Sequence, residues 1–290
     1  MRLASLYSGG KDSAFSMYLA EQQGHEIPYL VNIVPEDRAS WIFHTPNLNT
    51  VPAMAEAMGR ELVLGHSTGE EDSDMEGLRA ALDGLDVEGI VTGAVWSDYQ
   101  WDRMNIVCGD LGLKLMAPLW RKDQDMLMEQ MLDSGIEAVI VGCYAEGFDE
   151  SWLGRPIDAA ALRDLRRLRE RYGISIMGEG GEYESMTLYS PLYSGRLRIA
   201  SSEKEWTRNC GTLLVGELVP ENARSPNDPD VVFHCSRRDS GSNLPRRSAL
   251  AVTERDEHAM AAAASMGMWL NSPIPSTYGR PAAIGMHIAL

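Results

Sequence analysis

The chain has 290 residues, 44% of them hydrophobic, and a formal net charge of −16 from 42 acidic and 26 basic residues. This length predicts one large domain or two smaller ones, with enough residues for a sizeable core. No run of about 18 apolar residues indicates a membrane span, and residue 1 leads directly into a strand pattern instead of a signal peptide. The acidic charge disfavours nucleic acid as a partner and favours a protein with a basic patch.

The four cysteines are far apart in the sequence and form no C-x-x-C pair. They are Cys108, Cys143, Cys210 and Cys235. This spacing argues against a zinc site and against a disulfide framework. We therefore expect a protein of the reducing cytoplasm, without a membrane-bound part.

The first predicted elements are a strand over residues 2–6, a glycine-rich loop, and a helix with apolar spacing from residue 14. The loop consists of Ser8, Gly9, Gly10, Lys11, Asp12 and Ser13. A strand, a glycine-rich turn and a helix N-terminus together form an anion site, because the first-turn N–H groups point at the anion. Lys11 adds positive charge, the serines add hydroxyl donors, and Asp12 is a candidate magnesium ligand.

The loop does not match a Walker A sequence, which requires glycine and Ser or Thr where this chain has Ser5 and Asp12. No G-x-G-x-x-G sequence follows a strand either. Ser-Gly-Gly-Lys-Asp-Ser instead resembles the pyrophosphate loop of the N-type ATP pyrophosphatases, which cleave ATP to AMP and pyrophosphate. The alternative interpretation is a surface turn.

The segments that follow alternate between strand and helix patterns. Strands are predicted at 27–34, 61–64, 89–95, 113–116 and 137–142, and helices at 48–58, 70–82, 97–111 and 123–132. Strand–helix–strand units of this spacing form parallel sheets with right-handed crossovers. We expect an α/β fold with a doubly wound parallel sheet, forming a nucleotide-binding domain over residues 1–144.

Beyond residue 144 the pattern changes to a helix from Asp158 and three short strands, at 186–189, 196–200 and 212–218. We expect residues 145–220 to form a smaller α+β domain on the substrate side of the site. Residues 221–290 are rich in helix and strand breakers, and a poorly ordered tail without a catalytic role is predicted there.

Polar clusters follow several predicted strands, at the sheet edge where ligands of α/β proteins bind. The candidate residues are His44, Asn47, Ser97, Asp98, Tyr99, Gln100, Arg103, Trp120 and Lys122. Each has a structural alternative. In this alternative, His44 and Asn47 simply close a turn, and residues 97–103 form a solvated helix cap. Trp120 is then a packing residue and Lys122 a surface charge.

A further segment, residues 178–185, combines three glycines with Glu179, Glu182 and Glu184. Such a segment is flexible unless a ligand fixes it. Magnesium or an ammonium substrate would do so, because carboxylates attract both. A solvated acidic loop is the alternative. The arginines of residues 163–171 are predicted to lie on a solvated helix face.

Several segments together resemble the diphthine–ammonia ligase family. They are SGGKDS, WIFHTPN, GAVWSDYQWDRMNIVCGDLGLKLMAPLWRKDQ, ESWLGRPID and GEGGEYES, in order through about residues 1–220. The resemblance implies a HUP-type nucleotide-binding domain and ATP-dependent amidation of diphthine on translation elongation factor 2. ATP, Mg²⁺ and free ammonium are the implied cofactor, metal and nitrogen source, since no glutaminase-like segment is present.

Under this resemblance, residues 8–13 hold the β- and γ-phosphates with magnesium at Asp12. The catalytic candidates are Lys11, Asp12, Glu179, Glu182 and Glu184, and the three glutamates are candidates for binding ammonium or taking its proton. Tyr99, Gln100 and Arg103 would position diphthine or the adenylate. Two alternatives are a tRNA-modifying member of the superfamily, which adenylates a base oxygen, and a nucleotide-binding regulator without turnover.

Overall fold

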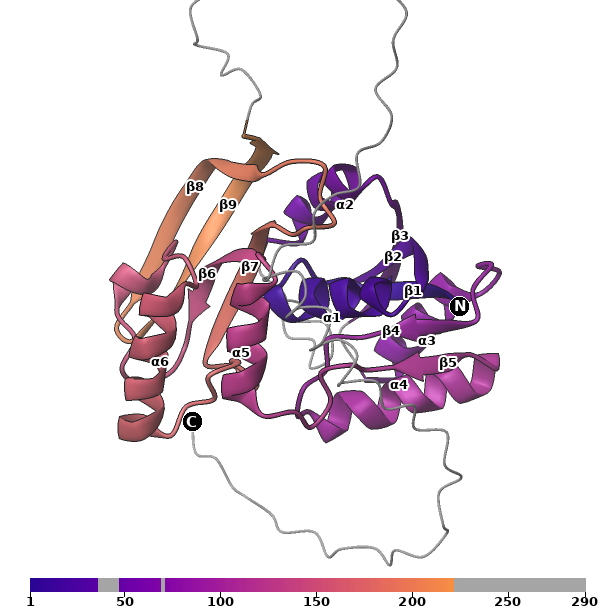
Figure 1. The fold of residues 1–290 in the computed structure, drawn as a ribbon, viewed down its shortest axis with the longest axis horizontal. Helices are drawn as coiled ribbons and strands as arrows, with labels where there is room; N and C mark the ends of the chain where they lie inside the picture. The colour runs from indigo at the N-terminus through magenta and orange to yellow at the C-terminus, as the bar shows by residue number, and fades with distance from the viewer. Residues whose placement is uncertain (36–46, 69–70, 222–290) are drawn as a thin grey trace, which may run out of the picture.

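A computed structural model describes residues 1–35, 47–68 and 71–221, and within them it contains two sheets (Figure 1). The first is parallel, with strand order β3-β2-β1-β4-β5, and the second is antiparallel, with order β7-β6-β9-β8. The first sheet consists of β1 (Arg2–Leu6), β2 (Glu26–Pro35), β3 (Glu61–Ser67), β4 (Gly89–Val91) and β5 (Lys114–Met116). The second consists of β6 (Glu137–Cys143), β7 (Tyr183–Tyr189), β8 (Leu197–Thr207) and β9 (Cys210–Pro220).

Helices cover both faces of the parallel sheet, which confirms the doubly wound α/β prediction. The helices are α1 (Lys11–Gln22), α2 (Val51–Met58), α3 (Glu71–Leu82), α4 (Asp98–Leu111), α5 (Gln124–Asp133) and α6 (Ala159–Tyr172), with short 3₁₀ turns at Leu48–Thr50 and Glu150–Trp152. Helices α1 and α2 pack on one face with Leu3 and Leu30, and α3 and α4 pack on the other with Val31 and Ile33. The core of the first face continues into the second sheet.

Three helices begin with a side chain that caps the first turn. The Ser97 side chain accepts from the Gln100 amide at the start of α4, and Gly112 ends that helix with a positive φ of 68°. Asp123 and Asp158 cap α5 and α6 in the same way as Ser97. These short polar side chains each satisfy one N–H group that the first helical turn leaves without an intrahelical acceptor.

The assignment of residues 137–142 to the parallel sheet is wrong. Strand β6 pairs antiparallel with β7 and β9, with Ile140 opposite Ser185 and Gly142 opposite Thr212. Its apolar run is buried on both faces, and a strand of either sheet type has that pattern when it is central. The division of the chain at residue 144 stays a prediction.

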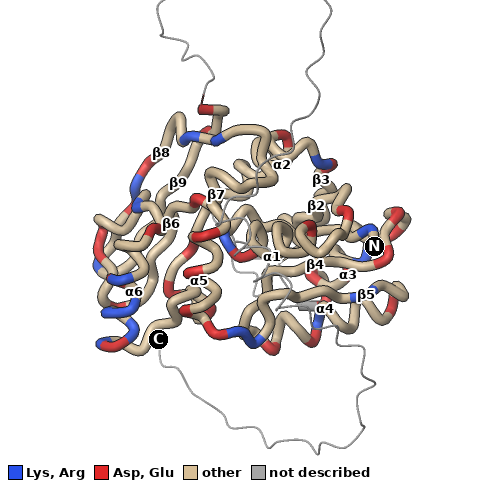
Figure 2. The backbone as a smooth tube through the Cα atoms, in the orientation of Figure 1, with Lys and Arg blue, Asp and Glu red and all other residues tan. Residues whose placement is uncertain are grey.

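Two arginines of α6 form ion pairs with the neighbouring helix α5. Basic positions on α6 face acidic positions on α5 (Figure 2), where Arg166 binds Asp125 at 2.6 Å and also Glu129, and Arg169 binds Asp125. These pairs stabilise the contact between the two helices.

Several other predictions lie outside the described residues, among them those for His44 and Cys235 and nearly all of the 221–290 tail. In the part of the chain that is described, no helix has the length and apolar character needed to cross a membrane. Cys108, Cys143 and Cys210 are free thiols there. The cytoplasmic location stays a prediction.

Candidate functional site

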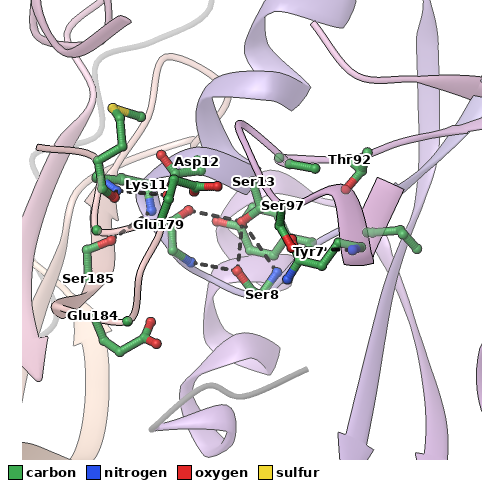
Figure 3. Close-up of a pocket in the computed structure, with 18 of the residues that line it drawn as sticks. Tyr7, Ser8, Lys11, Asp12, Ser13, Thr92, Ser97, Glu179, Glu184 and Ser185 are labelled. Atoms are coloured by element: carbon green, nitrogen blue, oxygen red, sulfur yellow. Dashed lines mark hydrogen bonds and ion pairs between the residues drawn. The ribbon is translucent and has the colours of Figure 1, made fainter. Parts of the chain in front are cut away.

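A cavity of about 560 Å³ opens where the strand order of the parallel sheet reverses, between β1 and β4. In α/β proteins this switch point, at the carboxyl ends of the strands, is where ligands bind. Four segments line the cavity: the 6–13 loop, the end of β2, the 92–100 segment, and residues 177–185 before and within β7 (Figure 3). The cavity thus lies between the two sheets.

The glycine-rich loop turns sharply between β1 and α1. Gly9 has a positive φ of 84°, a conformation that favours glycine. The loop is also fixed by the second sheet, since the Thr187 amide donates to the Gly9 carbonyl at 2.9 Å and the Lys11 amide donates to Ser185 Oγ at 3.2 Å. The Ser8 and Ser13 hydroxyls lie 3.2 Å apart at the cavity wall. The loop therefore has a fixed shape with hydroxyl groups toward the cavity.

Gly93 allows the segment after β4 to approach the start of α1, because a Cβ at this position would lie 2.7 Å from the Asp12 carbonyl carbon and the Ser13 nitrogen. The loop geometry therefore depends on glycine at position 93.

We expect Gly93→Ala to destabilise the fold by about 1–3 kcal/mol in urea unfolding, because backbone must move to admit the methyl group. Gly109→Ala is the matched control, since a Cβ at position 109 of α4 meets nothing within 4 Å. The control is expected to be neutral or slightly stabilising. Equal unfolding free energies for the two variants would contradict the close approach at Gly93.

Lys11 is buried, with 2% of its side chain exposed. Its Nζ donates to the Met177 carbonyl at 2.6 Å and to Asp12 Oδ2 at 2.8 Å, and it lies over the Tyr183 ring. Burial alone would lower the pKa of Lys11, but the nearby Asp12, Tyr183 and Glu179 outweigh burial and raise it. The lysine therefore places a permanent positive charge under the loop.

Asp12 has one carboxylate oxygen paired with Lys11 and one, Oδ1, that is buried without a hydrogen-bond partner among the described residues. Burial raises the pKa of this carboxyl, and Lys11 offsets only part of the effect. A buried oxygen of this kind fits a magnesium ion, which binds through one or two carboxylates and substrate phosphates. No cluster of three or more acidic, histidine or cysteine ligands occurs in the described ranges. Asp12 and nucleotide phosphates are thus the fitting ligand set.

Glu179 joins the two halves of the site. Its Oε2 accepts from the Trp96 amide, at the end of the segment after β4, at 3.0 Å. Burial and the neighbouring Asp12 carboxylate raise the pKa of Glu179 to about 7. At neutral pH this carboxyl therefore exchanges a proton readily, as a general base must.

The raised pKa predicts a pH-dependent stability. The folded protein holds the Glu179 proton more tightly than the unfolded chain. The stability that this proton contributes is fully present below the ordinary glutamate pKa, and it is lost as pH rises through about 7. We expect Glu179→Gln to be more stable than the wild type at pH 8, by about 1–3 kcal/mol, with the difference vanishing near pH 4. Urea unfolding across this range measures it, with the exposed Glu56→Gln as control. A difference between Glu179→Gln and the wild type that does not change with pH would contradict the burial of this carboxylate.

The structure brings ten of the predicted site residues to the cavity wall. They are Ser8, Gly10, Lys11, Asp12, Ser13, Ser97, Tyr99, Gln100, Glu179 and Glu184. Figure 3 shows the phosphate loop, Ser97 and Glu179 around one space, with Glu184 beside Ser185.

Other predicted residues lie outside the cavity lining. Asp98 binds Arg121 at 2.6 Å, and Trp120 stacks on Trp101 with ring centroids 4.6 Å apart. The Arg103 guanidinium lies over the Tyr99 ring, 3.2 Å from its centroid, and Lys122 contributes its carbonyl to the Trp96 indole.

The side chains of Asn47 and Glu182 form hydrogen bonds with backbone groups. Asn47 accepts from the Val215 amide at 2.7 Å and donates to the Leu213 carbonyl at 3.0 Å, so it ties the start of α2 to β9. Glu182 accepts from the Ser175 and Gly180 amides at 2.7 and 2.8 Å, which fixes the 178–182 turn.

The lining residues that were not predicted include Asn32, Met177 and Ser185. Asn32 has a sequence signal, since it is a single amide within the apolar run of β2. Met177 and Ser185 have no such signal, because each contributes through a contact with Lys11 that the fold creates.

This fold and cavity define a nucleotide-binding α/β protein, with its phosphate loop at the switch point of the sheet. The models of the diphthamide synthase N-terminal and C-terminal domains match residues 1–115 and 123–219. The chain is 36% identical over 264 residues to the diphthine–ammonia ligase of Bos taurus, covering 79% of this chain and 98% of the relative. It is 35% identical over 226 residues to that of Homo sapiens, covering 70% and 84%. The chain belongs to the diphthine–ammonia ligase family.

Proposed function

We propose that this chain uses ATP and ammonium to amidate diphthine on translation elongation factor 2, releasing AMP and pyrophosphate in the cytoplasm. The observation that carries the proposal is one cavity lined by the phosphate loop, the unpaired oxygen of Asp12 and the Glu179 carboxyl of raised pKa. The first two groups would serve the activation of a carboxylate by ATP, and the third would serve the attack by ammonia.

In the first step, a diphthine carboxylate oxygen attacks the α-phosphorus of ATP, and the bond from that phosphorus to the bridging oxygen breaks. Pyrophosphate leaves with the electron pair, and an acyl-adenylate is formed. The α1 N-terminus, the buried Lys11 charge and the two loop serines stabilise the negative charge of the departing pyrophosphate. Mg²⁺ held by Asp12 and phosphate oxygens would add further positive charge there.

In the second step, Glu179 accepts a proton from ammonium, and the resulting ammonia attacks the acyl carbon. The tetrahedral species collapses with loss of AMP, and the nitrogen releases a second proton to solvent, which leaves the neutral amide. A carboxyl with a pKa of about 7 is a stronger base than an ordinary glutamate, and it still loses its proton at neutral pH. Glu184, which lines the same cavity, would attract the ammonium cation.

The test is a release assay with purified chain, ATP, Mg²⁺, ammonium and diphthine-bearing elongation factor 2. AMP and pyrophosphate should form in equal amounts, and only when the modified factor is present. The same factor without diphthine is the control. AMP release of equal rate with the control factor would refute diphthine as the acceptor.

A further inference from the structure

Asn32 lies near the carboxyl end of β2, and its residue is 5% exposed. Val31 and Ile33 on either side pack into the core beneath α3 and α4. The Asn32 side chain points to the opposite face of the sheet, because neighbouring side chains of a strand alternate. There it lies beside the start of the phosphate loop and lines the cavity.

The orientation of the Asn32 amide is fixed by one hydrogen bond. Its Nδ2 donates to the Tyr7 carbonyl at 2.8 Å, immediately before the phosphate loop. A flipped amide would place two oxygens against each other, so the nitrogen must face Tyr7. The other atom of the amide, Oδ1, is buried and has no partner within the described part of the chain. A buried acceptor without a donor is costly, and a ligand that supplies the donor removes that cost.

The surroundings indicate which ligand supplies it. Leu6, Ala94 and Met104 also line this cavity and give it apolar surface, as a purine base requires. The phosphate loop begins one residue after Tyr7, so a nucleotide whose phosphates occupy the loop has its nucleoside part within reach of Asn32.

We propose that Asn32 Oδ1 accepts a hydrogen bond from the adenosine part of ATP, and that Asn32 is a specificity-determining residue of the nucleotide site. This inference rests on the use of ATP in the proposed function. Adenosine offers two kinds of donor, the 6-amino group of the base and the hydroxyls of the ribose, and both complement an amide oxygen.

The test is a titration of purified chain with Mg²⁺ and nucleotide, without the acceptor protein. Wild type and Asn32→Ala are compared for ATP, purine riboside triphosphate, 2′-deoxy-ATP and 3′-deoxy-ATP. Asn32→Ala is expected to bind ATP about tenfold more weakly, as for the loss of one hydrogen bond. One of the three analogues lacks the group that donates to Asn32 Oδ1. That analogue should bind wild type and Asn32→Ala with equal affinity, which identifies the donor.

Asn105→Ala is the matched control, because Asn105 is exposed and also donates to a single carbonyl, that of Trp101. Asn32→Leu is the second variant, should Asn32→Ala fail to fold, since leucine has nearly the size of asparagine but no amide oxygen.

Unchanged ATP affinity in a folded Asn32 variant would overturn the inference. An equal loss for all four nucleotides would do so too, because a purely structural role weakens them alike. Absence of ATP binding by the wild type would instead refute the proposed function itself.

Discussion

Replacement of Asp12 by asparagine is expected to slow AMP and pyrophosphate release about a thousandfold while the protein remains folded. Asparagine keeps the size of the side chain and an acceptor for Lys11, so the pair at 2.8 Å can persist as a hydrogen bond. The variant lacks the negative charge by which the buried Oδ1 would hold magnesium. Pyrophosphate release under saturating ATP, ammonium and modified elongation factor 2 measures the effect.

The control for this variant is Asp110→Asn, which removes a carboxylate that pairs with Arg79 on the surface between α3 and α4. Its release rate should match the wild type. Wild-type turnover by Asp12→Asn would contradict the role of Asp12 in holding a catalytic metal.

Replacement of Lys11 by methionine is expected to lower the free energy of unfolding by about 3 kcal/mol at pH 8, because a buried carboxylate loses its cation. Asp12 is 24% exposed, so solvent screens part of the penalty. The effect should shrink as pH falls, since burial already raises the pKa of Asp12 and the protonated carboxyl needs no partner. Urea unfolding at several pH values measures it.

A double variant distinguishes loss of charge balance from loss of packing. Lys11→Met combined with Asp12→Asn should recover most of the lost stability, because neither charge is then buried alone. Lys114→Met is the surface control, expected within about 0.5 kcal/mol of the wild type. A double variant as unstable as Lys11→Met alone would attribute the effect to packing against Tyr183 and Met177.

Features set by neighbouring residues were predictable from the sequence. The loop at residues 8–13 has a strand before it and a helix after it, so its conformation follows from contiguous residues. The helix caps at Ser97 and Asp123 follow from a side chain and an amide three residues apart. Local chemistry of this kind does not depend on the rest of the fold.

Features set by distant contacts were not predictable in the same way. The Lys11 side chain binds the Met177 carbonyl, 166 residues away in the sequence, and no pattern around either residue indicates this contact. The apolar run of β6 fits both sheet types, so only its partners decide which sheet it joins. Glu179 and Glu182 look alike in the sequence, but only the first lines the cavity, because the turn directs the second toward backbone amides.

The transfer of nitrogen tests the central proposal most directly. Purified chain is incubated with ATP, Mg²⁺, isotope-labelled ammonium and diphthine-bearing elongation factor 2, and the diphthine side chain is analysed by mass spectrometry. The proposed reaction predicts one labelled amide nitrogen on that side chain for each AMP released. AMP release without label on the elongation factor would contradict it.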